Sequence, residues 1–241
     1  MAVVLREDTG GIATLTLKRP EKLNAITRPM MIELRDHLEA IAADDAVGCV
    51  ILTGAGRCFG AGHDLADTGH SDEGSWRHFD AETVDRLETI RQPTIAAVHG
   101  HCITGSMELA LACDLVVAAE SAAFRDSHGV WGLVPIWGMS VRLPERVGPA
   151  RALDLGFTGR AVRGREALEI GLADRCVSDE QLLPASRELA ASIVANSWGT
   201  NERLKRLMHD QSTMSRVAAL AYERTRPYGL APDREARRRR E

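Results

Sequence analysis

Residues 93–120 read PTIAAVHGHCITGSMELALACDLVVAAE. The segments TIAAVHG and LVVAAE within this stretch are short continuous apolar runs, which are typical of strands buried on both faces of a sheet. Between them, GSMELALACD has the composition of a helix. Upstream, GCVILT at 48–53 predicts a further buried strand. Strands and helices in alternation predict an α/β fold for this chain.

The segments on either side extend this pattern. Residues 2–7 and 12–18 are rich in strand-forming residues, and the turn residues between them predict a hairpin. Thr27 is a candidate N-cap for a helix that begins around Pro29 and carries an apolar stripe. From about Gly138 onward helical segments predominate, so we expect most of the sheet to come from the first part of the chain.

Composition restricts the partners and the location that we expect. The formal net charge of −4 gives no electrostatic reason to expect a nucleic-acid partner, and the Arg-rich end DREARRRRE (233–241) is interpreted as a solvated helix end. The five cysteines include no C-x-x-C pair, so we expect free thiols and a cytoplasmic protein. We expect no signal peptide and no membrane span, because no apolar run approaches the required ~20 residues.

Residues 58–65, CFGAGHDL, follow the predicted strand at 48–53 and have very small side chains before a histidine and an aspartate. One interpretation is a dinucleotide-binding turn, because Gly54, Gly56 and Gly60 come after a strand. Their spacing is one residue longer than G-x-G-x-x-G, and no helical pattern follows. A dinucleotide site therefore fits this stretch poorly.

A metal site is the second interpretation, since His63, Asp64, His70 and Asp72 are close together in the sequence. No two of them have the i, i+4 spacing of helical zinc ligands, and no H-E-x-x-H motif or cysteine pair accompanies them. We therefore expect no metal.

The third interpretation is a loop that offers backbone N–H groups to a ligand. Thr104-Gly105-Ser106 opens the predicted helix within 93–120, and the first N–H groups of a helix have no internal acceptor. Glycine lets a ligand oxygen approach such an N–H closely. If the amide that follows Gly62 faces the amide of Gly105, the two form an oxyanion hole. Glu108, in the first turn of the helix, would then lie within reach of the ligand.

Several segments in order resemble the crotonase family, also called the enoyl-CoA hydratase/isomerase superfamily. They are LKRPEKLNAI (17–26), CFGAGHDL (58–65) and residues 93–124, 132–148 and 158–177. The resemblance covers most of the chain, and the motifs keep the family's order and spacing. It implies an α/β crotonase-like spiral of β-β-α units, followed by a C-terminal helical trimerisation region.

The resemblance also divides the chain. Residues 1–178 are expected to form a crotonase-like acyl-CoA-binding core, and 179–241 a C-terminal helical oligomerisation region. Apolar positions such as Leu189, Ile193 and Val194 would then lie between subunits of a homotrimer or homohexamer.

Roles for individual residues follow from the same resemblance. The backbone N–H groups of His63 and Gly105 would bind a thioester carbonyl, and Glu108 matches the first of two catalytic glutamates. His128 stands in place of the second, and we expect it, or Asp126, to assist proton transfer. Ile136 replaces a frequent glycine and implies a bulkier acyl pocket. The other residues expected to line the path of CoA are Lys22, Leu23, Ala25, Ala61, Asp64 and Leu65.

The function that the resemblance implies is hydration of 2-enoyl-CoA thioesters to 3-hydroxyacyl-CoA, through an enolate stabilised by the oxyanion hole. No cofactor is expected, because coenzyme A is part of the substrate. Two alternatives remain open: a double-bond isomerase that uses one carboxylate, and a weakly active acyl-CoA-binding protein of the same fold. The expected partners are an acyl-CoA thioester and further copies of the chain, with neither nucleic acid nor membrane.

Overall fold

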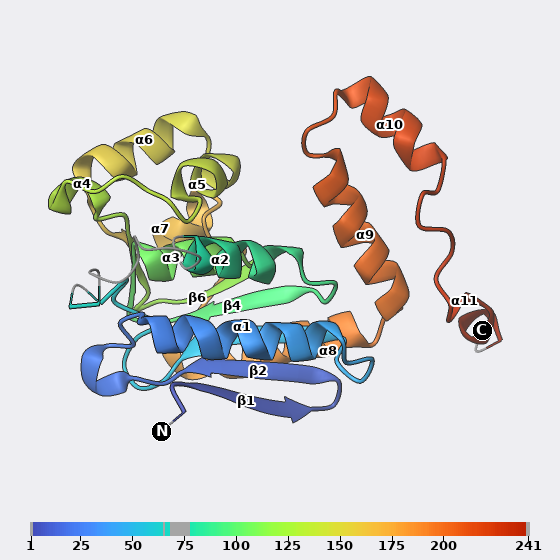
Figure 1. The fold of residues 1–241 in the computed structure, drawn as a ribbon, viewed down its shortest axis with the longest axis horizontal. Coiled ribbons are helices and arrows are strands. Elements are labelled where there is room, and N and C mark those ends of the chain that lie inside the picture. Colours follow the sequence, from blue (N-terminus) through green and yellow to red (C-terminus); the bar gives the residue numbers. More distant parts are fainter. Residues whose placement is uncertain (1, 65, 68–77, 240–241) are drawn as a thin grey trace.

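The computed structural model describes residues 2–64, 66–67 and 78–239, and its core is a sheet of mainly parallel strands (Figure 1). The described strands are β1 (Val4–Thr9), β2 (Ile12–Leu17), β3 (Cys49–Gly54), β4 (Thr94–Val98), β5 (His101–Ile103), β6 (Leu115–Ala119), β7 (Ala123–Arg125), β8 (Val162–Arg163) and β9 (Arg175–Val177). The larger sheet has the order β1-β2-β3-β4-β6-β9, and β5, β7 and β8 form a smaller one. The predicted α/β fold is confirmed.

Register in the larger sheet agrees with the hydrophobic pattern. β1 and β2 form the predicted antiparallel hairpin, and β2, β3, β4, β6 and β9 then pair in parallel. Every residue of β3 and of β4 is buried, as expected for strands that are covered on both faces.

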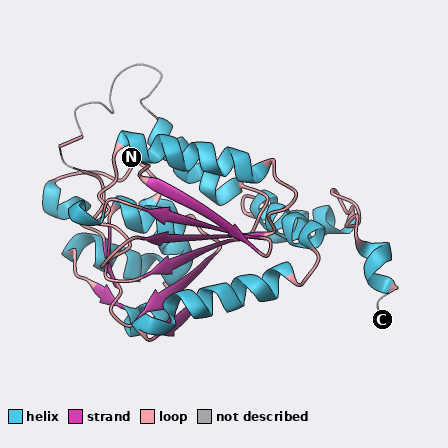
Figure 2. Ribbon diagram, turned by 90° about the horizontal axis from the view of Figure 1, so that it is seen from below, coloured by secondary structure: helices cyan, strands magenta, loops and turns pink. Residues whose placement is uncertain are grey.

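Helices cover both faces of this sheet (Figure 2). The described helices are α1 (Arg28–Ala42), α2 (Phe79–Thr89), α3 (Gly105–Leu111), α4 (His128–Trp131), α5 (Met139–Val147), α6 (Pro149–Thr158), α7 (Gly164–Glu169), α8 (Leu182–Val194), α9 (Trp198–Gln211), α10 (Arg216–Arg224) and α11 (Arg234–Arg238), with 3-10 helices η1 (Pro20–Lys22) and η4 (Asp179–Gln181). Helices α1, α2 and α3 share a hydrophobic core with alternate strand residues such as Val50 and Leu52. The residues between these, Cys49 and Ile51, belong to a second core that includes Leu182 and Ala190 of α8.

Helix α8 corrects one expectation from the sequence. Leu189, Ile193 and Val194 were expected between subunits, but they pack against the second core beneath the chain's own sheet. The reason is that the face of the sheet that carries Cys49 and Ile51 is apolar and must be shielded from water. Helix α8 packs on this face and shields it.

Helices α9 to α11 form an arm that extends away from the body of the molecule (Figure 1). Lys205 of α9 contacts the body through an ion pair with Asp114, at 2.8 Å between Nζ and Oδ2. In the described part of the chain, no helix combines the length and the apolar character that a membrane span requires.

Asn24 connects the chain after β2 to the chain after β3. Its side chain is fully buried and accepts a hydrogen bond from the amide of Arg19 at 2.9 Å. Its amide group donates to the carbonyls of Ala55 and Cys58, both at 2.8 Å. Its φ of 53° lies in the left-handed region, which asparagine tolerates better than most residues. These bonds hold the loops at the carboxyl ends of β2 and β3 together.

We predict that Asn24→Ala lowers the free energy of unfolding by about 2–4 kcal/mol, because one buried and two half-buried backbone groups lose their partner. Urea unfolding followed by circular dichroism measures the change. The control is Asn196→Ala, since Asn196 is exposed and its amide reaches only the carbonyl of Ser192. We expect the control to change stability by less than about 0.5 kcal/mol. Equal stability of the two variants would contradict the role assigned to Asn24.

Candidate active site

The loop at residues 58–64 lies against the start of α3. The amide of Gly62 donates to the hydroxyl of Ser106, at 3.0 Å, and Ser106 is fully buried. A Cβ atom at Gly60 would lie only 2.3 Å from that hydroxyl oxygen, so any larger residue there would displace Ser106. Gly62 has a φ of +91° and passes close to the carbonyl of Ile103. The small residues of the loop therefore allow it to pack directly on residues 103–106.

This packing leaves two backbone N–H groups without an acceptor. Gly60, Ala61 and Asp64 donate their amides to His101, Leu23 and Ile26, respectively. In the described part of the chain, the amide of His63 donates to no protein acceptor, and neither does that of Gly105 at the start of α3. Each unpaired amide belongs to a residue next to one partner of the Gly62–Ser106 hydrogen bond, and two such amides are candidate donors to an oxyanion. Whether they bind a carbonyl stays a prediction.

Glu108 lies in the first turn of α3 with 2% of its surface exposed. Its Oε1 atom accepts a hydrogen bond from the amide of Met139, at 3.0 Å. Burial raises the pKa of the Glu108 carboxyl, and the backbone amide of Met139 and the charge of His128 offset part of that rise. The group therefore exchanges a proton at a higher pH than an exposed glutamate does.

His128 and Asp126 form a hydrogen-bonded pair near Glu108. Nδ1 of His128 lies 2.7 Å from Oδ1 of Asp126, and the amide of His128 donates to the same oxygen at 3.0 Å. Burial by itself lowers the pKa of His128, but the hydrogen bond to Asp126 and the charges of Glu108 and Asp126 outweigh it, so the pKa is raised. Because Asp126 occupies Nδ1, Nε2 is the ring nitrogen that remains for proton exchange with a ligand.

Thr104 joins the helix that carries Glu108 to the segment that carries His128. Its hydroxyl lies 2.5 Å from that of Ser127 and accepts from the amide of Ser127 at 3.0 Å. The amide of Thr104 donates to the carbonyl of Arg125. Thr104 has a φ of 46° and a ψ of −108°, a strained backbone for a β-branched residue that costs about 1–3 kcal/mol. These hydrogen bonds hold the strained residue in place.

The residues expected along the CoA path lie at the same end of the sheet. Lys22 is exposed in η1, while Leu23 and Ala25 follow it and are half-buried. The amide of Ala61 donates to the carbonyl of Leu23 at 3.0 Å, which places the two segments side by side. The carboxylate of Asp64 pairs with Arg19, so its side chain fixes the loop. Leu65, the remaining member of the set, lies outside the described residues.

The side chain of His63 is half-buried and contacts Asp80 of α2 and the ring of Trp137. Its Nε2 atom lies 3.9 Å from the carboxylate of Asp80 in α2, and Asp80 also pairs with Arg28. The His63 ring meets Trp137 edge to face, with 5.5 Å between ring centroids. Nδ1 of His63 is buried and has no hydrogen-bond partner. The imidazole thus belongs to the wall of the site.

The two other interpretations of the loop gain nothing from the structure. In the described part of the chain, β3 is followed by no helix before α2, whereas a dinucleotide turn leads directly into one. Of the four residues considered as metal ligands, His63 and Asp64 are held by Asp80 and Arg19, and His70 and Asp72 lie outside the described residues.

Sequence reasoning missed two residues that build the site, Trp137 and Arg142, because they carried no recognisable motif signal. Ile136, expected to add bulk to the acyl pocket, lines a cavity between α2, α3, α5 and α9 but has 70% of its surface exposed, whereas its neighbour Trp137 is only 7% exposed. The direction of a side chain in an irregular segment depends on contacts with other elements, so the sequence did not indicate that Trp137 is the more buried of the two.

Comparisons with known proteins agree with this geometry. Residues 7–237 match the model of the family described as "Enoyl-CoA hydratase/isomerase". The chain is 33% identical over 226 residues to "Probable enoyl-CoA hydratase 1, peroxisomal" of Arabidopsis thaliana, which covers 94% of this chain and 85% of the relative. It is also 35% identical to the crotonyl-CoA hydratase of Syntrophomonas wolfei, over 80% of this chain and 75% of the relative.

Solved structures show the same likeness. The enoyl-CoA hydratase of Bacillus anthracis superposes with a TM-score of 0.91 at 30% identity, and the match covers 97% of this chain and 93% of the other. The enoyl-CoA hydratase of Mycobacterium tuberculosis superposes with a TM-score of 0.79 at 35% identity, covering 93% of this chain and 99% of the other.

We predict that NMR titration of the His128 ring gives a pKa above the ordinary value of 6.5, and that Asp126→Asn lowers it. The direction follows because the substitution removes a negative charge and an acceptor that both favour the protonated ring. The control, Asp36→Asn, alters an exposed carboxylate on α1 and leaves the His128 titration unchanged. A His128 pKa that stays the same in Asp126→Asn would show that the pair does not govern this ring.

Proposed function

The chain belongs to the enoyl-CoA hydratase/isomerase family, the crotonase superfamily, and we propose that it hydrates 2-enoyl-CoA thioesters to 3-hydroxyacyl-CoA. Its membership makes it a hydratase/isomerase-type enzyme. The observation that supports the proposal is a buried carboxyl group, Glu108, beside a protonatable ring, His128, next to two unpaired backbone amides.

The two amides act on the carbonyl of the thioester. With its oxygen bound by the N–H groups of His63 and Gly105, the carbonyl withdraws electrons from the double bond and makes C3 electrophilic. As a nucleophile adds, negative charge collects on the oxygen as an enolate. Each fixed donor of this kind lowers the barrier by about 2.7–4 kcal/mol. The amides are held in place before substrate arrives, by the hydrogen bond between Gly62 and Ser106.

Glu108 and His128 supply and return protons. Glu108, in its ionised form, removes a proton from water, and the resulting hydroxide adds to C3. His128, in its protonated form, gives a proton from Nε2 to C2 of the enolate, which yields the 3-hydroxyacyl thioester. Exchange of the proton from Glu108 back to His128 restores the starting state. The opposite charges favour this state, because each group stabilises the ionised form of the other.

The adenine and pantetheine parts of CoA would lie along Lys22, Leu23, Ala25, Ala61, Asp64 and Leu65. Lys22 is exposed beside this path and suits a phosphate group. We propose no cofactor beyond the CoA of the substrate, since every step above uses only protons and water.

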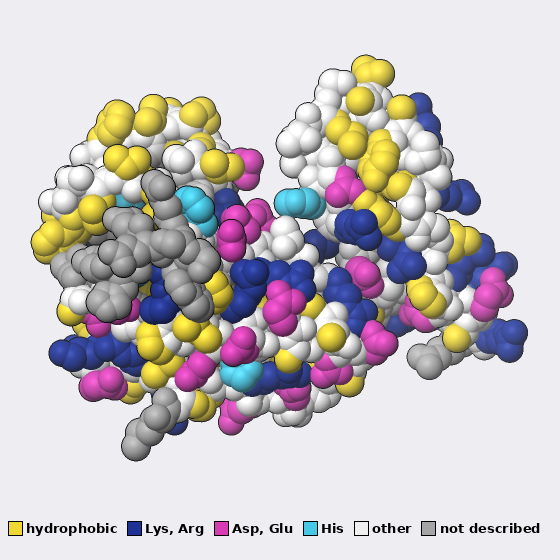
Figure 3. All heavy atoms as spheres, viewed as in Figure 1, with side chains coloured by type: hydrophobic (Ala, Val, Ile, Leu, Met, Phe, Trp, Pro, Cys, Tyr) yellow, Lys and Arg dark blue, Asp and Glu magenta, His cyan; other side chains and the backbone are white. Residues whose placement is uncertain are grey.

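We also propose a homotrimer or homohexamer in which the arm formed by α9 to α11 contacts other subunits. Large apolar side chains are exposed on the arm, with Val217 at 80%, and on α6, with Phe157 at 81%. Figure 3 shows hydrophobic atoms gathered over both regions. Contiguous apolar surface of this kind marks a protein contact. Within residues 179–241, α8 covers the sheet with one face, and the proposed subunit contacts come mainly from α9 to α11.

A cytoplasmic location remains part of the proposal. All five cysteines are free, and Cys49, Cys58, Cys102 and Cys113 are buried, which fits a reducing compartment.

We predict that Glu108→Gln reduces turnover of crotonyl-CoA by about 10²-fold or more, the scale of general acid–base catalysis, and keeps affinity for butyryl-CoA. The assay follows loss of the ultraviolet absorbance of the conjugated enoyl thioester, without a nicotinamide. Glu180→Gln, which alters an exposed acid in η4, is the control and should retain full activity.

The same assay separates the alternatives. An isomerase would act on 3-enoyl-CoA, and its absorbance would rise as the conjugated product forms. A binding protein would hold butyryl-CoA and turn over neither substrate. Full hydratase activity in Glu108→Gln would remove Glu108 from the mechanism.

For the assembly, we predict a light-scattering mass of three or six times the 26.2 kDa subunit. Phe157→Glu should reduce the assembly, because a charge replaces an apolar contact of α6. Arg151→Glu, on the same helix, is exposed and polar and serves as the control. A monomer mass for the unaltered chain would exclude the proposed assembly.

A further inference from the structure

Trp137 lies against both residues whose amides form the proposed oxyanion hole. A Cβ atom at Gly105 would lie only 2.6 Å from Cζ3 of Trp137, so the indole packs directly on the glycine backbone. The same indole meets the His63 ring at a centroid distance of 5.5 Å. A thioester held by these two amides must therefore extend its acyl group next to the indole of Trp137.

Arg142 fixes the position of Trp137. Its guanidinium donates to the carbonyl of Trp137 at 2.6 Å, and it pairs with Asp85 at 2.7 Å and Glu88 at 2.6 Å in α2. Gly138, with a φ of +102°, leaves room for this approach, because a Cβ atom there would lie 2.1 Å from the guanidinium. The next residue donates its amide to Glu108. One anchored segment thus carries the indole and orients the catalytic carboxyl.

A large cavity lies on the other side of Trp137. It has a volume of about 1040 Å³ and extends between α2, α3, α5 and α9. Apolar side chains line much of it, including Leu111, Ala112, Ile136, Val141, Leu204 and Met208, and charged groups such as Asp114, Glu145 and Lys205 also line it. Trp137 lines this cavity as well, whereas Gly105, Glu108 and His128 are not among its described lining residues. The indole therefore separates the catalytic groups from an apolar space.

We infer that Trp137 is the residue that limits acyl chain length, and that the enzyme takes short-chain 2-enoyl-CoA thioesters. The indole closes the passage from the amides of His63 and Gly105 into the cavity, so an acyl group of about four carbons fits and a long one meets the ring. The inference rests on the proposed function, because it assumes that the two amides hold the thioester.

Removal of the indole should open the passage. In Trp137→Ala, the tail of a longer acyl chain would move from water into the cavity. Each methylene group buried in this way strengthens binding by about fourfold. Val134→Ala is the matched control, because it removes bulk from a nearby apolar residue that is 79% exposed and is not among the described residues lining the cavity. Its chain-length preference should equal that of the unaltered protein.

The experiment compares kcat/KM for crotonyl-CoA and dodec-2-enoyl-CoA in the unaltered protein, Trp137→Ala and Val134→Ala. We expect the unaltered protein to favour crotonyl-CoA by at least about tenfold, and Trp137→Ala to shift the ratio at least about tenfold toward the long chain. An unaltered protein that uses both substrates equally, or a Trp137→Ala ratio that does not move, overturns the inference. A shift in Val134→Ala as large as that in Trp137→Ala overturns it as well.

Binding measurements keep this test separate from the proposed reaction. Calorimetric titration with butyryl-CoA and dodecanoyl-CoA reports chain-length preference without turnover. If the unaltered protein binds butyryl-CoA more tightly but hydrates nothing, the proposed function fails and the inference holds. Equal affinity for the two overturns the inference. If Trp137→Ala unfolds the protein, as checked by circular dichroism, Trp137→Leu replaces it. The chain-length preference of the unaltered protein is measured without any variant, so this part of the test does not depend on folding of the variants.

Discussion

Glu108 is an ionisable group that lies almost entirely out of water, and the geometry of the site follows from the cost of that burial. An isolated buried carboxylate is unstable unless hydrogen bonds or an opposite charge compensate for lost hydration. Here the amide of Met139 and the ring of His128 do so, and the pKa of Glu108 still stays raised. Because its pKa is raised, the ionised form of this carboxyl group is a stronger base than an exposed glutamate.

Four segments meet at this carboxyl group, and each is held by a specific contact. Ser106 binds the amide of Gly62, Thr104 binds Ser127, and Met139 binds Glu108 itself. The first two contacts come from Thr104 and Ser106, the residues on either side of Gly105. Their side chains therefore connect the loop at residues 58–64, α3 and the segment that carries His128.

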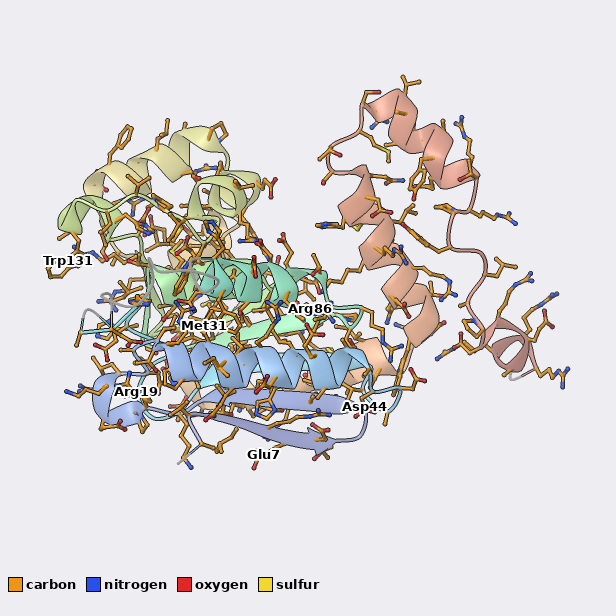
Figure 4. The ribbon with its side chains drawn as sticks, viewed as in Figure 1. Glu7, Arg19, Met31, Asp44, Arg86 and Trp131 are labelled. Atoms are coloured by element: carbon orange, nitrogen blue, oxygen red, sulfur yellow. The ribbon has the colours of Figure 1, made fainter. Side chains whose placement is uncertain are left out.

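The replacement of the second glutamate by His128 changes the charge balance of the site. Two glutamates near each other repel, which makes one of them hold a proton. A glutamate and a histidine instead favour a state in which both are charged, and Asp126 strengthens this by stabilising the protonated ring. Trp131 of the same short helix, α4, lies at the outer margin of the molecule, with 59% of its surface exposed (Figure 4). Only the first residue of α4 faces the site.

The sequence by itself determined the strands, the main helices and a candidate site. Buried parallel strands read as continuous apolar runs, and a helix start after a glycine predicts free amides, so β3, β4, α3 and Gly105 followed from local pattern. The resemblance to the family indicated Glu108 and His128 as the candidate catalytic pair. Tertiary structure alone decided that Asp126 holds His128, that Trp137 is buried against Gly105 while Ile136 stays largely exposed, and that α8 covers the sheet. These outcomes depend on contacts between segments distant in sequence, such as Arg142 with α2 and α8 with β3, and no local pattern encodes which of two neighbouring side chains such a contact turns inward.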